Sequence, residues 1–153
     1  MARMTELEPT LVAHLEALEC RRYDDEPWVA GPPLSARRVA IISTAGLMRR
    51  GDRPFDVGDA GYRLIPGDLA AADLVMSHIS SNFDRTGFQQ DMNVAFPLDR
   101  LRELADAGTI GSVANFHYSF MGATDPELMA PTVEHLAPLL KKDAVDAVLL
   151  VPV

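Results

Sequence analysis

Runs of apolar residues separated by polar, glycine-rich stretches predict several strands along the chain. Val39–Ile42 forms the first strong apolar run, and residues 146–153 (DAVLLVPV) form the densest one. A run of valine and leucine of that density is typical of a strand buried on both faces of a parallel sheet. Residues 62–65, 74–77 and 110–122 are further strand candidates, the first of them as an edge strand.

Three other stretches carry apolar residues at helical spacing. Residues 5–20 place Leu11, Leu15 and Leu18 on one face, so we expect an amphipathic helix there. Residues 94–108 have Pro97 for a first turn and Gly108 as a stop signal. Residues 124–143 begin with the capping candidates Thr124 and Asp125. Pro131 and Pro138 interrupt this pattern, which predicts two short helices or one kinked helix.

Strands that alternate with helices predict a layered α/β fold with a mainly parallel sheet flanked by helices. Residues 1–36 are expected to form an N-terminal helix and an irregular arm, and residues 37–153 the α/β domain. A buried strand normally leads into a loop and a covering helix. None follows residues 146–153, so we expect a domain that is truncated and incomplete at its C-terminus.

Charge narrows the classes of function. The chain has 14 Lys and Arg against 22 Asp and Glu, a formal net charge of −8. Such a balance argues against binding to nucleic acid or to an anionic membrane. The apolar runs are too short to span a bilayer, and no signal peptide is present, so we expect a cytoplasmic protein. The single cysteine, Cys20, excludes an internal disulfide.

Polar side chains follow several of the predicted strands, and the carboxyl edge of a parallel sheet is the usual ligand site. We therefore take as candidate pocket-lining residues His78, Asp84, Asp91, Asn93, His117 and Ser119. Three interpretations stay open. The first is a metal site of mixed nitrogen and oxygen ligands from His78, Asp84, Asp91 and His117. The second is acid–base catalysis by a histidine that one of the aspartates orients. The third is a structural role, in which these groups bond loops to the sheet edge.

Several well-defined catalytic motifs are missing from the sequence. Neither GxGxxG nor GxxxxGK[ST] follows a strand, HExxH is absent, and Ser119 lacks a surrounding GxSxG. We therefore expect no bound cofactor in this chain.

Three segments taken in order resemble a known family. They are residues 54–66 (PFDVGDAGYRLIP), residues 77–123, which include NVAFPLDRLRELADAGTIGSVANFHYSFMGA, and residues 141–153 (KKDAVDAVLLVPV). Together they are similar to the glycine/sarcosine/betaine/D-proline reductase selenoprotein B family, from about Val39 to Val153.

This resemblance implies a selenocysteine-dependent reductase that cleaves the bond between an α-carbon and an amino nitrogen. The substrate would be a small amine or amino acid such as glycine, sarcosine, betaine or D-proline, and dithiols would be the ultimate electron donors. The family nucleophile is a selenocysteine, or a cysteine in its place. It follows a strand like AVLLVPV, so we expect it immediately after Val153. The resemblance also implies a pyruvoyl-bearing partner subunit and a thiol electron donor.

The chain departs from the family in having neither a selenocysteine nor a Cys-x-x-Cys pair, so we expect the 153 residues alone to be inactive. Two alternatives remain beside a truncated reductase subunit. One is a non-catalytic binding or assembly protein of the same ancestry, whose last strand a partner or a second copy would cover. The other is a metal-dependent enzyme that uses the histidine and aspartate cluster.

Overall fold

The computed structural model describes residues 4–17, 24, 26–80 and 83–153. The chain divides into two units, Met1–Ala30 and Gly31–Val153. The first contains the 3-10 turn η1 (Met4–Glu6) and the helix α1 (Pro9–Glu16), so the helix predicted for residues 5–20 forms over its central part. Leu18 and Cys20 lie outside the described residues.

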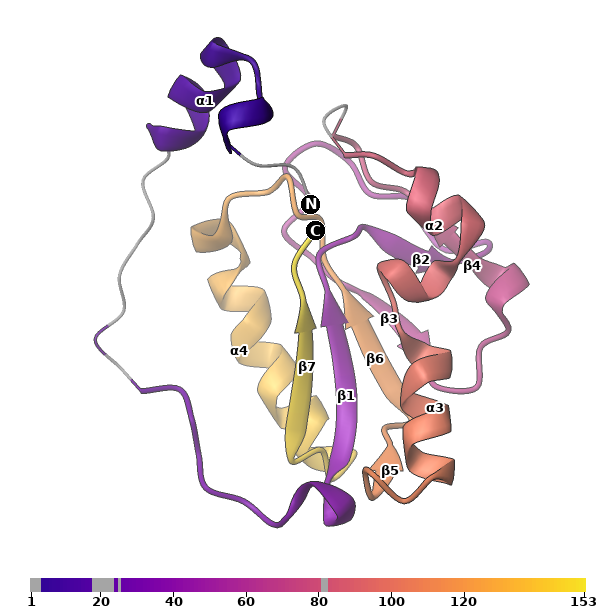
Figure 1. Ribbon diagram of the computed structural model, residues 1–153. Coiled ribbons are helices and arrows are strands. Elements are labelled where there is room, and N and C mark those ends of the chain that lie inside the picture. The colour runs from indigo at the N-terminus through magenta and orange to yellow at the C-terminus, as the bar shows by residue number, and fades with distance from the viewer. Residues whose placement is uncertain (1–3, 18–23, 25, 81–82) are drawn as a thin grey trace. The chain divides into compact units, whose positions relative to one another are not determined.

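The second unit is built on a mainly parallel sheet with β1 (Arg38–Ser43) at its centre (Figure 1). The strand β7 (Ala147–Val151) pairs with one side of β1, in parallel. On the other side β1 pairs in parallel with β5 (Ser112–Val113) and then with β6 (Phe116–Ser119). The edge strand β3 (Arg63–Pro66) runs antiparallel to β6. The predicted α/β fold with a mainly parallel sheet is confirmed.

The strand predicted for residues 74–77 forms, but outside this sheet. It is β4 (Leu74–Met76), which pairs in antiparallel fashion with β2 (Leu47–Arg49) in a separate two-stranded sheet. The short turns η2 (Leu34–Ala36) and η3 (Ala71–Asp73) precede β1 and β4. The local sequence pattern predicts a strand at residues 74–77. The strand with which it pairs depends on the path that the chain takes after β1.

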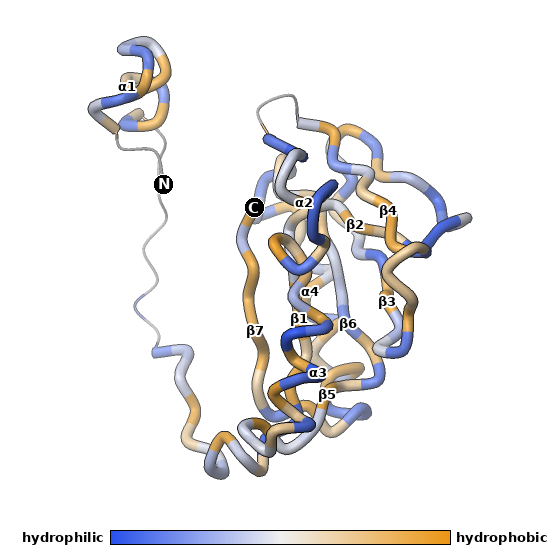
Figure 2. The backbone as a smooth tube through the Cα atoms, turned by 45° about the vertical axis from the view of Figure 1, so that its right-hand side comes forward, coloured by the Kyte–Doolittle hydropathy of each residue, from blue (hydrophilic) through white to orange (hydrophobic). Residues whose placement is uncertain are grey.

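Helices cover both faces of the main sheet (Figure 1). The helix α3 (Leu98–Asp106) packs with Leu98 and Leu101 against the face that carries Val39 and Ile41. It is preceded on the chain by α2 (Thr86–Gln90) and η4 (Met92–Val94). The opposite face presents Tyr118 and Phe120, which pack with Leu136 of α4 (Pro126–Lys142). In Figure 2, which colours the backbone by hydropathy, β7 stands out as a hydrophobic strand.

The helix α4 is continuous over 17 residues, so the prediction of two short helices is wrong. Asp125 caps it by accepting a hydrogen bond from the Glu127 amide, and Pro126 occupies the first turn. Pro131 and Pro138 are both exposed and lie seven positions apart, on the side opposite the buried Leu136. Because water can bond the carbonyl groups on that side, the helix tolerates both prolines.

The strand β7 departs from the burial that its sequence predicts. It lies at an edge of the sheet, and the exposed fractions of Val148, Leu149 and Leu150 are 39%, 38% and 68%. Its apolar side chains and one row of backbone groups are therefore accessible, which is unusual for an unprotected edge strand.

Among the described residues, no helix is both long enough and apolar enough to cross a membrane.

An ion pair at the amino end of the sheet fixes α4 to β1. Arg38 Nη2 lies 2.8 Å from Asp143 Oδ1, and Asp143 Oδ2 accepts hydrogen bonds from the amides of Asn115 and Phe116. Burial alone would raise the pKa of Asp143, but the Arg38 and backbone hydrogen bonds outweigh it and lower that pKa below its usual value.

We expect Asp143→Asn to lower the free energy of unfolding by about 2 kcal/mol, because it leaves Arg38 without its counter-charge in a half-buried position. Urea denaturation at pH 7 measures the change. The matched control is Glu103→Gln, which breaks the exposed Arg100–Glu103 pair and should cost less than about 0.5 kcal/mol. Equal effects of the two changes would contradict a structural role for the Arg38–Asp143 pair.

Candidate active site

The carboxyl ends of β1, β6 and β7 meet at one edge of the sheet (Figure 1). Thr44, directly after β1, links all three ends. Its amide donates to the carbonyl of Val151, and its carbonyl accepts from the amide of Gly122. Its hydroxyl oxygen Oγ1 accepts a hydrogen bond of 2.8 Å from the amide of Val153.

The topology makes this edge the expected ligand site. β6 and β7 flank β1 on opposite sides, and the helices that precede them on the chain, α3 and α4, cover opposite faces. Such a reversal leaves a crevice outside the carboxyl ends of the strands. In this chain the corresponding position, which we call the crevice, is the carboxyl edge of β1 and β7, where the Val153 amide is hydrogen-bonded to Thr44 Oγ1.

Glycine is required where the segment after β6 approaches this crevice. A Cβ atom on Gly122 would lie 2.6 Å from the Val153 carbonyl oxygen and 2.9 Å from that of Thr44. The chain ends of β1, β6 and β7 can therefore pack this closely only because Gly122 has no side chain.

His78 lies beside the same edge, after β4. A Cβ atom added to Gly46 would lie 2.9 Å from the His78 Cα. The turn after β1 therefore packs directly on the His78 backbone. The side chain is 7% exposed, and its Nδ1 accepts a hydrogen bond from the Ser80 amide. Its Nε2 is buried and has no hydrogen-bond partner in the part of the chain that the structure describes. Burial, assisted by the charge of Arg85, lowers the pKa of His78.

Asp84, Asp91 and Asn93 form turns that start the short helices α2 and η4. Asp84 accepts from the amide of Thr86, and Asp91 accepts from both the amide and the side chain of Asn93. These hydrogen bonds lower the pKa of each aspartate. Asn93 also exchanges hydrogen bonds with Asp99 at the start of α3. Asp91 and Asn93 come together in this way and line a groove of about 470 Å³.

His117 and Ser119 lie inside the sheet. His117 Nδ1 accepts a hydrogen bond of 2.9 Å from the Ile41 amide, and Ser119 Oγ accepts one of 2.8 Å from the Leu47 amide. Both side chains are fully buried, and the His117 ring meets Phe96 edge to face at 5.8 Å. Each therefore satisfies a backbone donor, as the structural interpretation predicts. Burial lowers the pKa of His117 to about 4.

The metal interpretation is wrong. Within residues 4–17, 24, 26–80 and 83–153, no three side chains of His, Cys, Asp or Glu are grouped closely enough to hold a metal ion. His117 lies in the core, while Asp84 and Asp91 bond their own turns. The spacing of these four candidate ligands along the sequence does not show that they lie apart, because they belong to three different parts of the fold.

The turn after β1 contains residues of the site that are not among the candidates from the sequence. Its residues Thr44 and Gly46 make the contacts that define the crevice, and a small-residue turn after a strand was the available signal. Arg85 is not among the candidate residues from the sequence. Its guanidinium donates hydrogen bonds to the carbonyl groups of His78 and Ser80 and so joins the start of α2 to the segment after β4.

Comparisons with known proteins agree with the resemblance seen in the sequence. The family described as glycine/sarcosine/betaine reductase selenoprotein B matches residues 62–153. The D-proline reductase subunit gamma of Acetoanaerobium sticklandii is 36% identical over 115 residues, which cover 73% of this chain and 47% of that protein.

Two subunits from Peptoclostridium acidaminophilum are also similar. The betaine reductase complex component B subunit beta is 29% identical over 134 residues, covering 82% of this chain and 30% of that protein. The sarcosine reductase complex component B subunit beta is 30% identical over 95 residues, covering 58% and 21% respectively.

The chain thus spans about half or less of the length of these curated relatives. No solved structure matches it significantly. The family match covers more than half of the chain and includes α3, β5, β6, α4 and β7, which bring the crevice together. The chain belongs to the glycine/sarcosine/betaine reductase selenoprotein B family.

Proposed function

We propose that this chain forms part of a reductase subunit that cleaves the α-carbon–nitrogen bond of a small amine or amino acid like glycine, sarcosine, betaine or D-proline. Two electrons would come from a dithiol, which becomes a disulfide. Of the two protons, one would end on the released nitrogen and one on the α-carbon. The observation that carries the proposal is that the carboxyl ends of β1, β6 and β7 are joined through Thr44 in a chain of this family, with the Val153 amide bonded to Thr44.

The nucleophile in this proposal is a selenocysteine, or a cysteine in its place, directly after Val153 in the complete protein. Val153 is held at the crevice by Thr44, so the next residue would enter the usual ligand position of an α/β fold. The reactive species is the anion, and a selenol ionises more readily than a thiol, whose pKa is about 8.5. A helix that started there would stabilise the anion with its partial positive charge.

Partner subunits are part of the proposal. The relatives are named as a reductase subunit and as components of betaine and sarcosine reductase complexes. By analogy, this subunit would work with a pyruvoyl-bearing subunit that activates the amine, and with a thiol protein that delivers electrons. Its net charge of −8 favours protein surfaces of positive charge as partners.

The test is turnover by the complete protein, with its partner subunits, a dithiol, and each of glycine, sarcosine, betaine and D-proline. We expect one of them to be cleaved, and we expect serine at the position after Val153 to reduce the rate at least about 1000-fold, because an alcohol is a far weaker acid and nucleophile. The matched control is Cys20→Ser, which should leave the rate unchanged. Turnover by the 153-residue chain alone, or by the serine variant, would contradict the proposed nucleophile.

A second candidate function rests on the exposed edge of β7. A binding or assembly protein of the same ancestry would cover Leu150, which is 68% exposed, with a partner or a second copy. If a second copy covers it, sedimentation should show a dimer that Leu150→Glu dissociates. The complete protein would then also show no turnover in the assay above.

A further inference from the structure

The hydrogen-bond ladder between β1 and β7 ends on a side chain. Ser43 lies opposite Val151 in this parallel pair, and the Thr44 amide donates to the Val151 carbonyl. In a regular parallel ladder, the next hydrogen bond would run from the Val153 amide to the Thr44 carbonyl. Instead, the Val153 amide donates to the Thr44 hydroxyl oxygen at 2.8 Å. The side chain of Thr44 therefore takes the place of its own carbonyl group.

The carbonyl group of Thr44 is missing from this ladder because it is bonded on the other side of β1, where β6 lies. There it accepts a hydrogen bond of 2.8 Å from the Gly122 amide, and the Phe120 carbonyl accepts one of 2.9 Å from the Gly46 amide. These two bonds join the turn after β1 to the segment after β6. Neither involves the Thr44 side chain, so loss of the hydroxyl group would leave this turn in place.

Both backbone groups of Val153 are bonded to the Thr44 hydroxyl group. Oγ1 accepts from the Val153 amide and donates to the Val153 carbonyl oxygen, which lies 3.2 Å away. Pro152 has no amide proton, so the Val153 amide is the first donor on the chain after Val151. Threonine is stiff at χ1 because it is branched at Cβ, so its hydroxyl group is held in one place. A single rigid side chain thus fixes the backbone of Val153.

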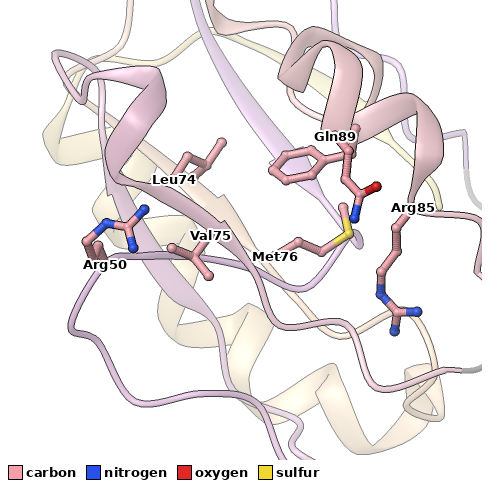
Figure 3. Close-up of a pocket in the computed structure, with 7 residues that line it drawn as sticks. Arg50, Leu74, Val75, Met76, Arg85 and Gln89 are labelled. Atoms are coloured by element: carbon pink, nitrogen blue, oxygen red, sulfur yellow. The ribbon is translucent and has the colours of Figure 1, made fainter.

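The Thr44–Val153 bonds are separate from the groove of about 310 Å³ that lies beside β4 and α2. Figure 3 shows this groove with Leu74, Val75 and Met76 of β4 along it. Neither Thr44 nor Val153 is among the residues that line it. A change of the Thr44 side chain therefore leaves the groove unaltered, and its effects arise at the ends of β1 and β7.

We propose that Thr44 is a positioning residue of the reductase: its hydroxyl group fixes the backbone of Val153 and thereby the direction in which the next residue enters the crevice. That this next residue is the nucleophile rests on the proposed function. Reacting atoms must be held about 3–3.5 Å apart, and a displacement of about 1 Å can slow a reaction about 100-fold. Because Val153 directly precedes the nucleophile, a rotation of its backbone displaces the nucleophile by such an amount.

Thr124 provides a matched comparison at the same edge of the sheet. It follows β6, it is buried, and its hydroxyl group donates a hydrogen bond of 3.1 Å to the Asp59 carbonyl. Thr44→Val and Thr124→Val make the same change of shape, and each removes a hydroxyl group that donates to a backbone carbonyl. Only Thr44→Val also removes the acceptor of the Val153 amide.

The first measurement is hydrogen exchange of the Val153 amide, followed by NMR in the isotope-labelled complete protein. We expect this amide to exchange at least about tenfold more slowly than in an unfolded peptide, and we expect Thr44→Val to remove the protection. Thr44→Ser keeps the acceptor oxygen and should retain the protection, as should Thr124→Val. A thermal melt of each variant checks that it is folded. If Thr44→Val does not fold, Thr44→Ala takes its place in the comparison with Thr44→Ser.

The second measurement is steady-state turnover by the same variants, with the partner subunits, a dithiol and the amine that the wild type cleaves. We expect Thr44→Val to lower kcat about 100-fold and to change KM less than about threefold, because it displaces the nucleophile and leaves the binding of the amine intact. Thr44→Ser should restore kcat to within about fivefold of the wild type. Thr124→Val should keep it within about threefold.

The two measurements separate this inference from the proposed function. An unprotected Val153 amide in the wild type, or protection that Thr44→Val does not change, refutes the role of Thr44 whatever the activity. Protection as expected in a complete protein that cleaves no amine refutes the proposed function and leaves the Thr44–Val153 bonds standing. Turnover whose kcat is unchanged by Thr44→Val, or is lowered equally by Thr124→Val, refutes the positioning role and leaves the reductase.

Discussion

Replacing Gly46 by alanine should lower the free energy of unfolding by about 3 kcal/mol and reduce the melting temperature of the domain by about 10 °C. Gly46 has a φ angle of +63°, where an alanine is strained by about 1–2 kcal/mol. Its Cβ would also lie 2.9 Å from the His78 Cα, a backbone atom that cannot move alone, and 2.9 Å from the Met121 Cε. The remaining cost comes from this overlap.

Gly51→Ala is the matched control for the backbone strain. Gly51 also has a positive φ angle, +91°, but a Cβ there would meet nothing within 4 Å. We expect it to cost about 1 kcal/mol, so the difference between the two variants measures the packing of the β1 turn on His78. The measurement is urea denaturation followed by circular dichroism. Equal costs would mean that the β1 turn does not pack tightly on His78.

The stability of the domain should fall by about 3 kcal/mol between pH 6.5 and pH 4 because of His117. Burial first, and then the charges of Arg102 and Arg38 against that of Asp143, lower the pKa of His117 from 6.5 to about 4. Above pH 6.5 the histidine is neutral in the folded and the unfolded chain, so it has no pH-dependent effect. As the pH falls below 6.5, only the unfolded chain takes up the proton, and stability is lost until the folded chain also binds it near pH 4.

His117→Asn isolates this contribution. The asparagine oxygen can accept the Ile41 amide in place of Nδ1, but it does not titrate. The variant should be less stable at pH 7, because it loses the ring contact with Phe96, yet its stability should vary less between pH 6.5 and pH 4. His78 also has a lowered pKa, so it reduces stability at acidic pH in the wild type and in the variant alike. The aspartates with lowered pKa values change stability mainly below pH 3.8. Identical pH dependence in both proteins would refute the buried neutral His117.

The strands and helices with strong local patterns could be predicted from the sequence. The apolar run Val39–Ile42 predicts the strand β1. The leucine stripe of residues 94–108 predicts the helix α3, which starts at the residue directly after Pro97. For residues 124–143 the two prolines leave a choice between two short helices and one kinked helix, and the continuous helix α4 excludes the first. The prolines lie on its exposed side, and only the tertiary structure shows which side that is.

The sequence places the candidate residues near the ends of predicted strands, but it does not give the surroundings of their side chains. The sequence predicts His117 and Ser119 as pocket-lining residues, whereas in the structure their side chains accept hydrogen bonds from backbone amides inside the sheet. Asp84 and Asp91 start short helices. A polar residue near the end of a predicted strand is compatible with either role, because its hydrogen-bond partner is distant in the sequence.

The sequence by itself determined the α/β class, the family and the acidic charge, because each depends on composition, periodicity or a contiguous motif. The tertiary structure decided which strands are neighbours, that β7 is an exposed edge, and that Thr44, Gly122 and Val153 meet at one crevice. Such properties depend on contacts between residues far apart in the chain, whose free energies are set by packing and desolvation rather than by local pattern.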